Sequence, residues 1–182
     1  LGETGTRNVT LSTGKLWDRL NEYTIPALNT SATGRFDIYY RDGAGGWTKV
    51  ATQSQWPNEQ YDNNSGTLVT MTNNRYANLW FYIETDGDLI MLYGQDQFVT
   101  QAQAEADSPP STVPERITAS GRLIGRFVFQ KSASVTSHID SVFETVFSSS
   151  GISDHTTLTN LAWTSSGHTG TANTVPYFNS SG

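Results

Sequence analysis

Residues 75–94, RYANLWFYIETDGDLIMLYG, decide the fold class. Two runs of aromatic and aliphatic residues, 76–83 and 89–93, lie on either side of Asp86 and Gly87. An Asp-Gly step between β-forming runs is a strong signal for a hairpin. Large side chains occupy both alternating faces of the first run, so we expect other parts of the chain to cover at least one face. The stretch therefore predicts the central hairpin of a β-sheet core.

The composition of the whole chain favours an all-β protein with many turns. Of the 182 residues, 12% are aromatic and only 15% are charged, while Ser, Thr, Asn and Gly are abundant. Aromatic and β-branched residues favour strands, and small polar residues favour turns. We expect a mainly antiparallel sandwich or open barrel with one or two short helices.

The charge and residue inventory excludes several classes of function. The formal net charge is −6, and the 11 Lys and Arg residues form no cluster, whereas binding to a phosphate backbone needs concentrated positive charge. We therefore expect no nucleic-acid partner. The chain has no cysteine, which excludes thiolate metal sites and cysteine nucleophiles. We also expect no membrane insertion, because no apolar run approaches the roughly 20 residues of a membrane helix.

Further strands are predicted where apolar and polar residues alternate between turn signals. Residues 35–41 and 47–51 flank a glycine-rich turn and predict a second, smaller hairpin. Ile117 and residues 123–130 predict a last strong strand, in which Gly125 indicates a bulge or a close backbone approach. Shorter strands are predicted at residues 8–12, 60–61 and 67–72.

In three other segments the sequence pattern is a weaker guide to secondary structure. Residues 16–23 carry apolar side chains at helical spacing, but the segment fits a strand equally well. Residues 98–106, FVTQAQAEA, favour a short helix, and a proline-rich crossing over residues 108–114 follows it. Residues 135–147 fit either a helix or an irregular strand.

A change in composition predicts a boundary near residue 148. We expect residues 1–148 to form a β-rich domain and residues 149–182 to form an extended segment rich in Ser, Thr and Gly. The few apolar residues of the second segment cannot bury a core alone. Segments of this kind gain burial by pairing with copies of themselves.

Three carboxylates at Glu84, Asp86 and Asp88 are the most site-like feature of the central stretch. Acids this close together can bind a hard cation or act as an acid–base pair. The competing interpretation is a β-turn with solvated acids, which we favour because a tight hairpin needs Asp-Gly and because the ligand pattern of an EF-hand is missing.

The histidines give no metal-binding pattern within one chain. His138, His155 and His168 are 17 and 13 residues apart, so none stand at the spacings that converge on one ion. In a trimer, His155 or His168 from each chain could meet on the axis. We predict no metal, no cofactor and no catalytic residue, because the sequence also lacks the common nucleophile and phosphate-binding motifs.

Aromatic residues in or beside turns raise a second hypothesis. Trp47, Trp56 and Tyr61 have polar neighbours, and aromatic rings in such places can stack on sugars. Packing of these rings beneath loops is the interpretation that we favour, because buried aromatics stabilise a small β core. A glycan-binding patch at these three residues stays as the alternative.

Residues 151–173, GISDHTTLTNLAWTSSGHTGTAN, carry a family resemblance. They resemble the D-H-x-x-L-x-x-L segments, followed by an S-G-H-T-G-T run, of tail fibres and other tail-associated proteins of tailed bacteriophages. Upstream, the proline-rich crossing and residues 124–130 look like the end of the β-rich head domain that precedes such segments. No catalytic residue is carried over, because these segments are structural.

The resemblance implies a non-catalytic, homotrimeric component of a virion tail that supports host attachment. Its partners would be copies of itself and other tail or baseplate proteins, with a host surface glycan as a further candidate. The residues expected to hold the chains together are Leu158, Leu161, Trp163, His155 and His168. Two alternatives remain, a carbohydrate-binding receptor-recognition domain and a depolymerase associated with the fibre.

Overall fold

The computed structural model describes residues 1–145 and 147. The chain divides into two units, Leu1–Ser149 and Ser150–Gly182, and the fold below is that of the first. The predicted oligomerisation residues Leu158, Leu161, Trp163, His155 and His168 lie outside the described residues. The strands are β1 (Gly2–Thr4), β2 (Asn8–Leu11), β3 (Gly14–Asp18), β4 (Asn21–Ile25), β5 (Leu28–Asn29), β6 (Phe36–Arg41), β7 (Trp47–Gln53), β8 (Gln60–Tyr61), β9 (Val69–Thr70), β10 (Tyr76–Glu84), β11 (Leu89–Tyr93), β12 (Gly121–Gln130) and β13 (His138–Ser141), and the helices are α1 (Gln101–Glu105) and α2 (Glu115–Ser120).

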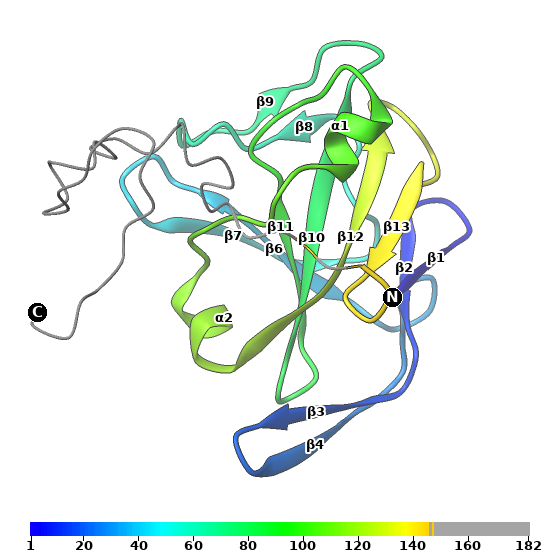
Figure 1. Cartoon of the computed structure of the whole chain (residues 1–182), viewed down its shortest axis with the longest axis vertical. Helices are drawn as coiled ribbons and strands as arrows, with labels where there is room; N and C mark the ends of the chain where they lie inside the picture. The colour runs from blue at the N-terminus through cyan, green and yellow to red at the C-terminus, as the bar shows by residue number, and fades with distance from the viewer. Residues whose placement is uncertain (146, 148–182) are drawn as a thin grey trace, which may run out of the picture. The chain divides into compact units, whose positions relative to one another are not determined.

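A six-stranded sheet forms the centre of the domain, in the order β13-β12-β10-β11-β6-β7 (Figure 1). All of its neighbouring strands are antiparallel except β11 and β6, which run parallel. The sheet is open, with β13 and β7 at its edges. The expectation of an all-β protein with one or two short helices is therefore confirmed, and the fold is sandwich-like because smaller sheets pack on one face of the large one.

The predicted central hairpin is confirmed. Strands β10 and β11 pair from Leu79 with Tyr93 to Ile83 with Leu89. The backbone N–H of Glu84 donates to the carbonyl of Asp88 at 3.0 Å, which leaves three residues in the loop. Gly87 closes this loop with φ = 93°, a left-handed conformation that glycine adopts without steric cost.

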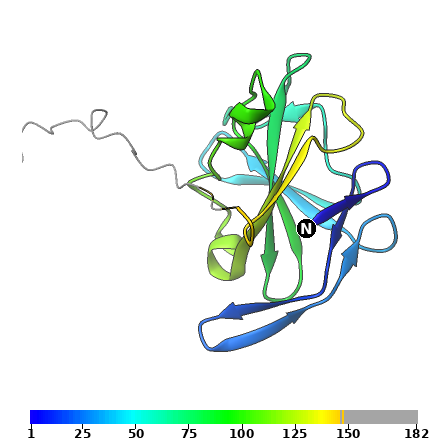
Figure 2. The same cartoon turned by 45° about the vertical axis from the view of Figure 1, so that its right-hand side comes forward.

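Both faces of this hairpin are buried, as the alternation of its large side chains predicts. One face contributes Leu79, Phe81 and Ile83 to a core that also contains side chains from β2, β6 and β12. The other face places Trp80 and Tyr82 beneath the segment of α2. The small sheet β1-β2-β5 lies on the first side and the helices on the second, which Figure 2 shows edge-on.

Gly125 confirms both features predicted for it. The pairing of β10 with β12 shifts register between Phe81 and Tyr82, which lie opposite Gly125 and Leu123, so β12 carries one extra residue there. A Cβ atom on Gly125 would also lie 2.2 Å from the backbone oxygen of Asp140. Only glycine therefore allows β13 to approach β12 this closely. Ile117, which we expected in the same strand, belongs instead to α2.

The segments with undecided patterns now have definite structures. Residues 16–23 form most of an antiparallel hairpin, β3–β4, in which Leu16 pairs with Tyr23. Leu20 occupies its tip and is 94% exposed, so no helical apolar stripe exists there. The predicted short helix is confirmed as α1, with a capping box between Thr100 and Gln103. The segment from 135 contains β13 and no helix among its described residues.

The remaining strand predictions are also met in part or in full. The second hairpin is present as β6 and β7, and the strand predicted at 60–61 is β8. The strand predicted at 67–72 is reduced to β9, Val69–Thr70, which pairs with β8. No helix of the described residues is long and apolar enough to span a membrane.

Candidate functional site

The β3–β4 hairpin, residues 14–25, leaves the body of the domain as an arm. It forms a two-stranded sheet of its own and extends past the end of the large sheet (Figure 1). Two large apolar side chains of the arm are uncovered, Trp17 at 57% and Leu20 at 94% exposure. Arg19 beside Leu20 has φ = 56°, which turns the chain tightly at the tip.

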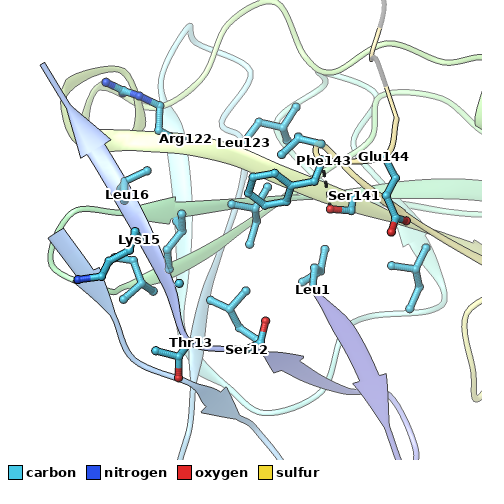
Figure 3. Close-up of a pocket in the computed structure, with 17 residues that line it drawn as sticks. Leu1, Ser12, Thr13, Lys15, Leu16, Arg122, Leu123, Ser141, Phe143 and Glu144 are labelled. Atoms are coloured by element: carbon cyan, nitrogen blue, oxygen red, sulfur yellow. Dashed lines mark hydrogen bonds between the residues drawn. The ribbon is translucent and has the colours of Figure 1, made fainter. Parts of the chain in front are cut away.

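A groove of about 800 Å³ lies between the base of the arm and the ends of β12 and β13 (Figure 3). Its wall is mainly apolar and includes Leu11, Leu16, Ile25, Leu123, Ile139 and Phe143. Phe143 forms part of the rim and is 89% exposed. The backbone N–H of Thr145 donates to the carbonyl of Ser141 at 2.8 Å, so a hydrogen-bonded turn holds Phe143 in this position.

The basic side chains beside the groove are paired within the chain. Lys15 makes a 2.6 Å ion pair with Glu22 and donates to Thr24 at 2.8 Å. Arg122 makes a 2.6 Å ion pair with Asp18. A small ligand is usually oriented by a few polar groups that point at it. The groove offers an apolar surface instead, which suits the side chains of another polypeptide.

The acidic cluster at the tip of the central hairpin is joined to α2 by Arg116. Arg116 Nε donates to Glu84 Oε1 at 2.9 Å, its Nη2 bonds the second oxygen of Glu84, and the same nitrogen bonds Asp88 at 3.0 Å. The hydrogen bonds to Glu84 raise the pKa of Arg116, against the opposing effect of burial. The third acid, Asp86, accepts a hydrogen bond from the backbone of Asp88 at 3.0 Å.

These contacts favour the interpretation of the acids as part of a structural turn. The carboxylate oxygens of Glu84, Asp86 and Asp88 lie within 4.8 Å of one another, which is close enough for a hard cation. Arg116 already binds Glu84 and Asp88, however, and Glu84 is buried. The cluster fastens the hairpin turn to α2, and we assign neither a metal nor an acid–base role to it.

A second polar cluster, around Asp140, has the residue types of a catalytic triad without its geometry. His138 Nε2 lies 3.1 Å from Asp140 Oδ1, and the hydroxyl of Thr145 donates to that same oxygen at 3.1 Å. In a triad the hydroxyl bonds the imidazole and the imidazole bonds the acid. Here both groups bond the acid, and Arg126 occupies its other oxygen, so the cluster is a structural network.

The structure does not bring the predicted glycan-binding residues together. Trp56 is fully buried, donates from Nε1 to Glu3 at 2.8 Å and packs on Phe129, so its inclusion in an exposed patch is wrong. Tyr61 is half-buried against the core on one side of the sheet, and Trp47 packs against the core on the other side. Only the favoured interpretation, packing beneath loops, agrees with these positions.

The exposed residues of the arm tip and the groove rim do not stand out in the amino-acid sequence. Trp17 and Leu20 lie in a segment whose pattern fits a helix or a strand, and Phe143 lies in a segment with an undecided apolar pattern. The available signal was a turn-forming Asn21 directly after Leu20. It indicates a loop, but it does not say that the loop stands clear of the body.

Comparison of the chain with family models, with curated proteins and with solved structures gives no significant match.

Proposed function

We propose that this chain is a non-catalytic structural component of a phage tail fibre or of a tail or baseplate appendage. It assembles as a homotrimer, belongs to the virion tail and supports attachment to the host. The observation that carries the proposal is that one β domain presents both an uncovered apolar arm and an apolar groove. Apolar surfaces of this kind mark sites of protein association.

The charged groups of the described domain support a structural role. Arg116 bonds Glu84 and Asp88. Both carboxylate oxygens of Asp140 accept hydrogen bonds, one from Arg126 and the other from Thr145. A glycosidase needs two carboxyl groups free to act on a sugar in a groove. The groove described above has Glu144 as its acidic lining residue, which does not make such a pair.

The assignment to phage tails rests on the resemblance of residues 151–173, which lie outside the described residues. The described domain suits the head domain that the resemblance implies. Its central sheet is covered on both faces, and a buried ion pair ties the edge strand β13 to β12. Such a domain can act as a rigid platform at a junction.

The carbohydrate-binding alternative receives less support from the geometry. Trp47 and Tyr61 keep partial exposure but pack on opposite sides of the sheet. The guanidinium of Arg41 already lies 4.8 Å from the centre of the Trp47 ring. A sugar would have to displace this cation–π contact to stack there.

Immunogold electron microscopy of phage particles tests the proposed location. Antibodies raised against residues 1–145 should label the tail of particles produced by cells that carry the gene, and peptides of the chain should be found in the purified particles. Particles of the phage that encodes the chain, purified without any of its peptides, would contradict the proposal.

A further inference from the structure

We propose that the tip of the β3–β4 arm, Arg19 and Leu20, docks into the groove of a second copy of this chain, against Phe143 and Glu144. The inference rests on the self-assembly in the proposed function and adds a contact that the resemblance does not supply. The contact joins two different surfaces, so it is head-to-tail. A repeated head-to-tail contact closes into a ring when the rotation between copies divides a full turn, as a three-fold rotation does.

The tip carries two features that suit a partner surface. Leu20 is 94% exposed at the end of a projecting hairpin, where its side chain contacts water on nearly all sides. Arg19 is exposed as well, and the structure records no ion pair between it and any described residue. The tip therefore presents an apolar side chain next to an uncompensated positive charge.

The rim of the groove presents the complementary pair. Phe143 is 89% exposed and Glu144 follows it, also exposed, and both lie at the mouth of the groove (Figure 3). Among the described residues, no ion pair to Glu144 is recorded. An apolar residue next to a negative charge thus faces outward here, matching the apolar residue and positive charge of the tip.

The occupant that we propose is another copy, because the tip of the arm does not line its own groove and the charges of tip and rim are opposite. The groove is lined by the base and middle of the arm, through residues such as Lys15 and Leu16, whereas Arg19 and Leu20 are not among its lining residues. The 94% exposure of Leu20 shows that the described residues of its own chain do not cover its side chain. The basic side chains beside the groove are already paired within the chain. The charge of the rim that can attract the tip is therefore that of Glu144.

Disulfide trapping in the full chain tests this contact, and the lack of native cysteine makes the experiment clean. The double variant Leu20→Cys/Phe143→Cys should form covalent dimers and trimers under mild oxidation. The matched control Leu20→Cys/Val99→Cys uses another exposed apolar residue outside the groove and should crosslink about tenfold more slowly. Both substitutions in each variant are at exposed positions, so folding should be preserved.

Charge reversal distinguishes docking from chance collision of the cysteines. In the double-cysteine background, Arg19→Glu should slow crosslinking about tenfold at low ionic strength, because it replaces an attraction by a repulsion. Adding Glu144→Arg should restore the rate. The difference should shrink near 1 M salt, where the screening length is only about 3 Å.

The outcomes separate this contact from the proposed function. Equal crosslinking in the variant and the control, or a disulfide within a single chain, would overturn the docking. If the chain is nevertheless a trimer, the proposed function stands without this contact. A chain that is a monomer and does not crosslink would remove both.

Discussion

Arg126 and Asp140 form a buried ion pair, with 2.5 Å between Nε and Oδ2, that joins β12 to the edge strand β13. The remaining guanidinium nitrogens of Arg126 donate to backbone carbonyls at the end of α1, including Ala104 at 3.1 Å and Asp107 at 2.9 Å. The same guanidinium lies 5.2 Å from the centre of the Trp80 ring. One side chain thus connects a strand, the end of a helix and the apolar cluster around Trp80.

Replacing Asp140 by Asn should therefore destabilise the domain by about 3 kcal/mol, because the buried guanidinium loses its counter-charge. Burial works against ionisation of Asp140, but the hydrogen bond and charge of Arg126 outweigh it, so the pKa of Asp140 lies below its usual range. The stabilisation is present above the unfolded pKa of about 3.9. It is lost as the pH falls through the lower folded value.

Urea unfolding of the wild type and Asp140→Asn at several pH values measures this effect. The difference in the free energy of unfolding should be largest near pH 7 and should shrink below about pH 4. A difference that stays constant down to pH 2 would show that the ion pair is not its source.

Alkaline pH should destabilise the protein through a buried tyrosine. Burial raises the pKa of the Tyr82 phenol to about 12, so the folded state favours the neutral form. The resulting stabilisation is fully present below the unfolded pKa of about 10 and is lost as the pH rises toward 12. The urea midpoint of the wild type should fall over this pH range, and the midpoint of the Tyr82→Phe variant should fall less steeply. Identical pH profiles for the two proteins would contradict this explanation.

The two tryptophans among the glycan-binding candidates, Trp47 and Trp56, should differ in their contribution to the stability of the domain. Trp56→Ala should cost about 3 to 5 kcal/mol, because it empties a fully buried site and removes the hydrogen bond to Glu3. Trp47→Ala should cost about 1 kcal/mol, mainly the contact with Arg41. Thermal unfolding monitored by circular dichroism compares them. A mild effect of Trp56→Ala would show that the ring is not a core residue.

Calcium should leave the melting temperature of the wild type unchanged, because Arg116 already binds the carboxylates of Glu84 and Asp88. In Arg116→Ala, Glu84 and Asp88 lose this partner, and among the described residues all three acids are left without a cation beside them. The variant should be destabilised by about 2 kcal/mol, and millimolar calcium should raise its melting temperature. Differential scanning calorimetry measures both proteins. A rise of several degrees in the wild type would mean that the cluster is a cation site.

Local signals were sufficient for the central hairpin and for the bulge in β12. Asp86 and Gly87 specify a turn without help from distant residues, and the alternation in β10 specifies a strand buried on both faces. Gly125 in a strong strand pattern likewise indicated a close backbone approach. Each of these features is encoded within about ten residues.

Long-range contacts decided the features that the sequence could not predict. Trp56 lies next to a proline in a loop, yet its ring is buried against Phe127 and Phe129 and its Nε1 donates to Glu3, 53 residues away. Glu84 is neutralised by Arg116, 32 residues away. Residues 16–23 were ambiguous because Leu16, Leu20 and Tyr23 fit helical spacing, and only the pairing of Leu16 with Tyr23 favours the strand. No local pattern shows that a hairpin will stand clear of the body.

The most direct test of the central claim is the mass of the full chain in solution. Size-exclusion chromatography with light scattering at micromolar concentration should give three times the chain mass of 20.0 kDa. A mass of one chain under these conditions, with residues 151–182 present, would contradict a self-assembling fibre component.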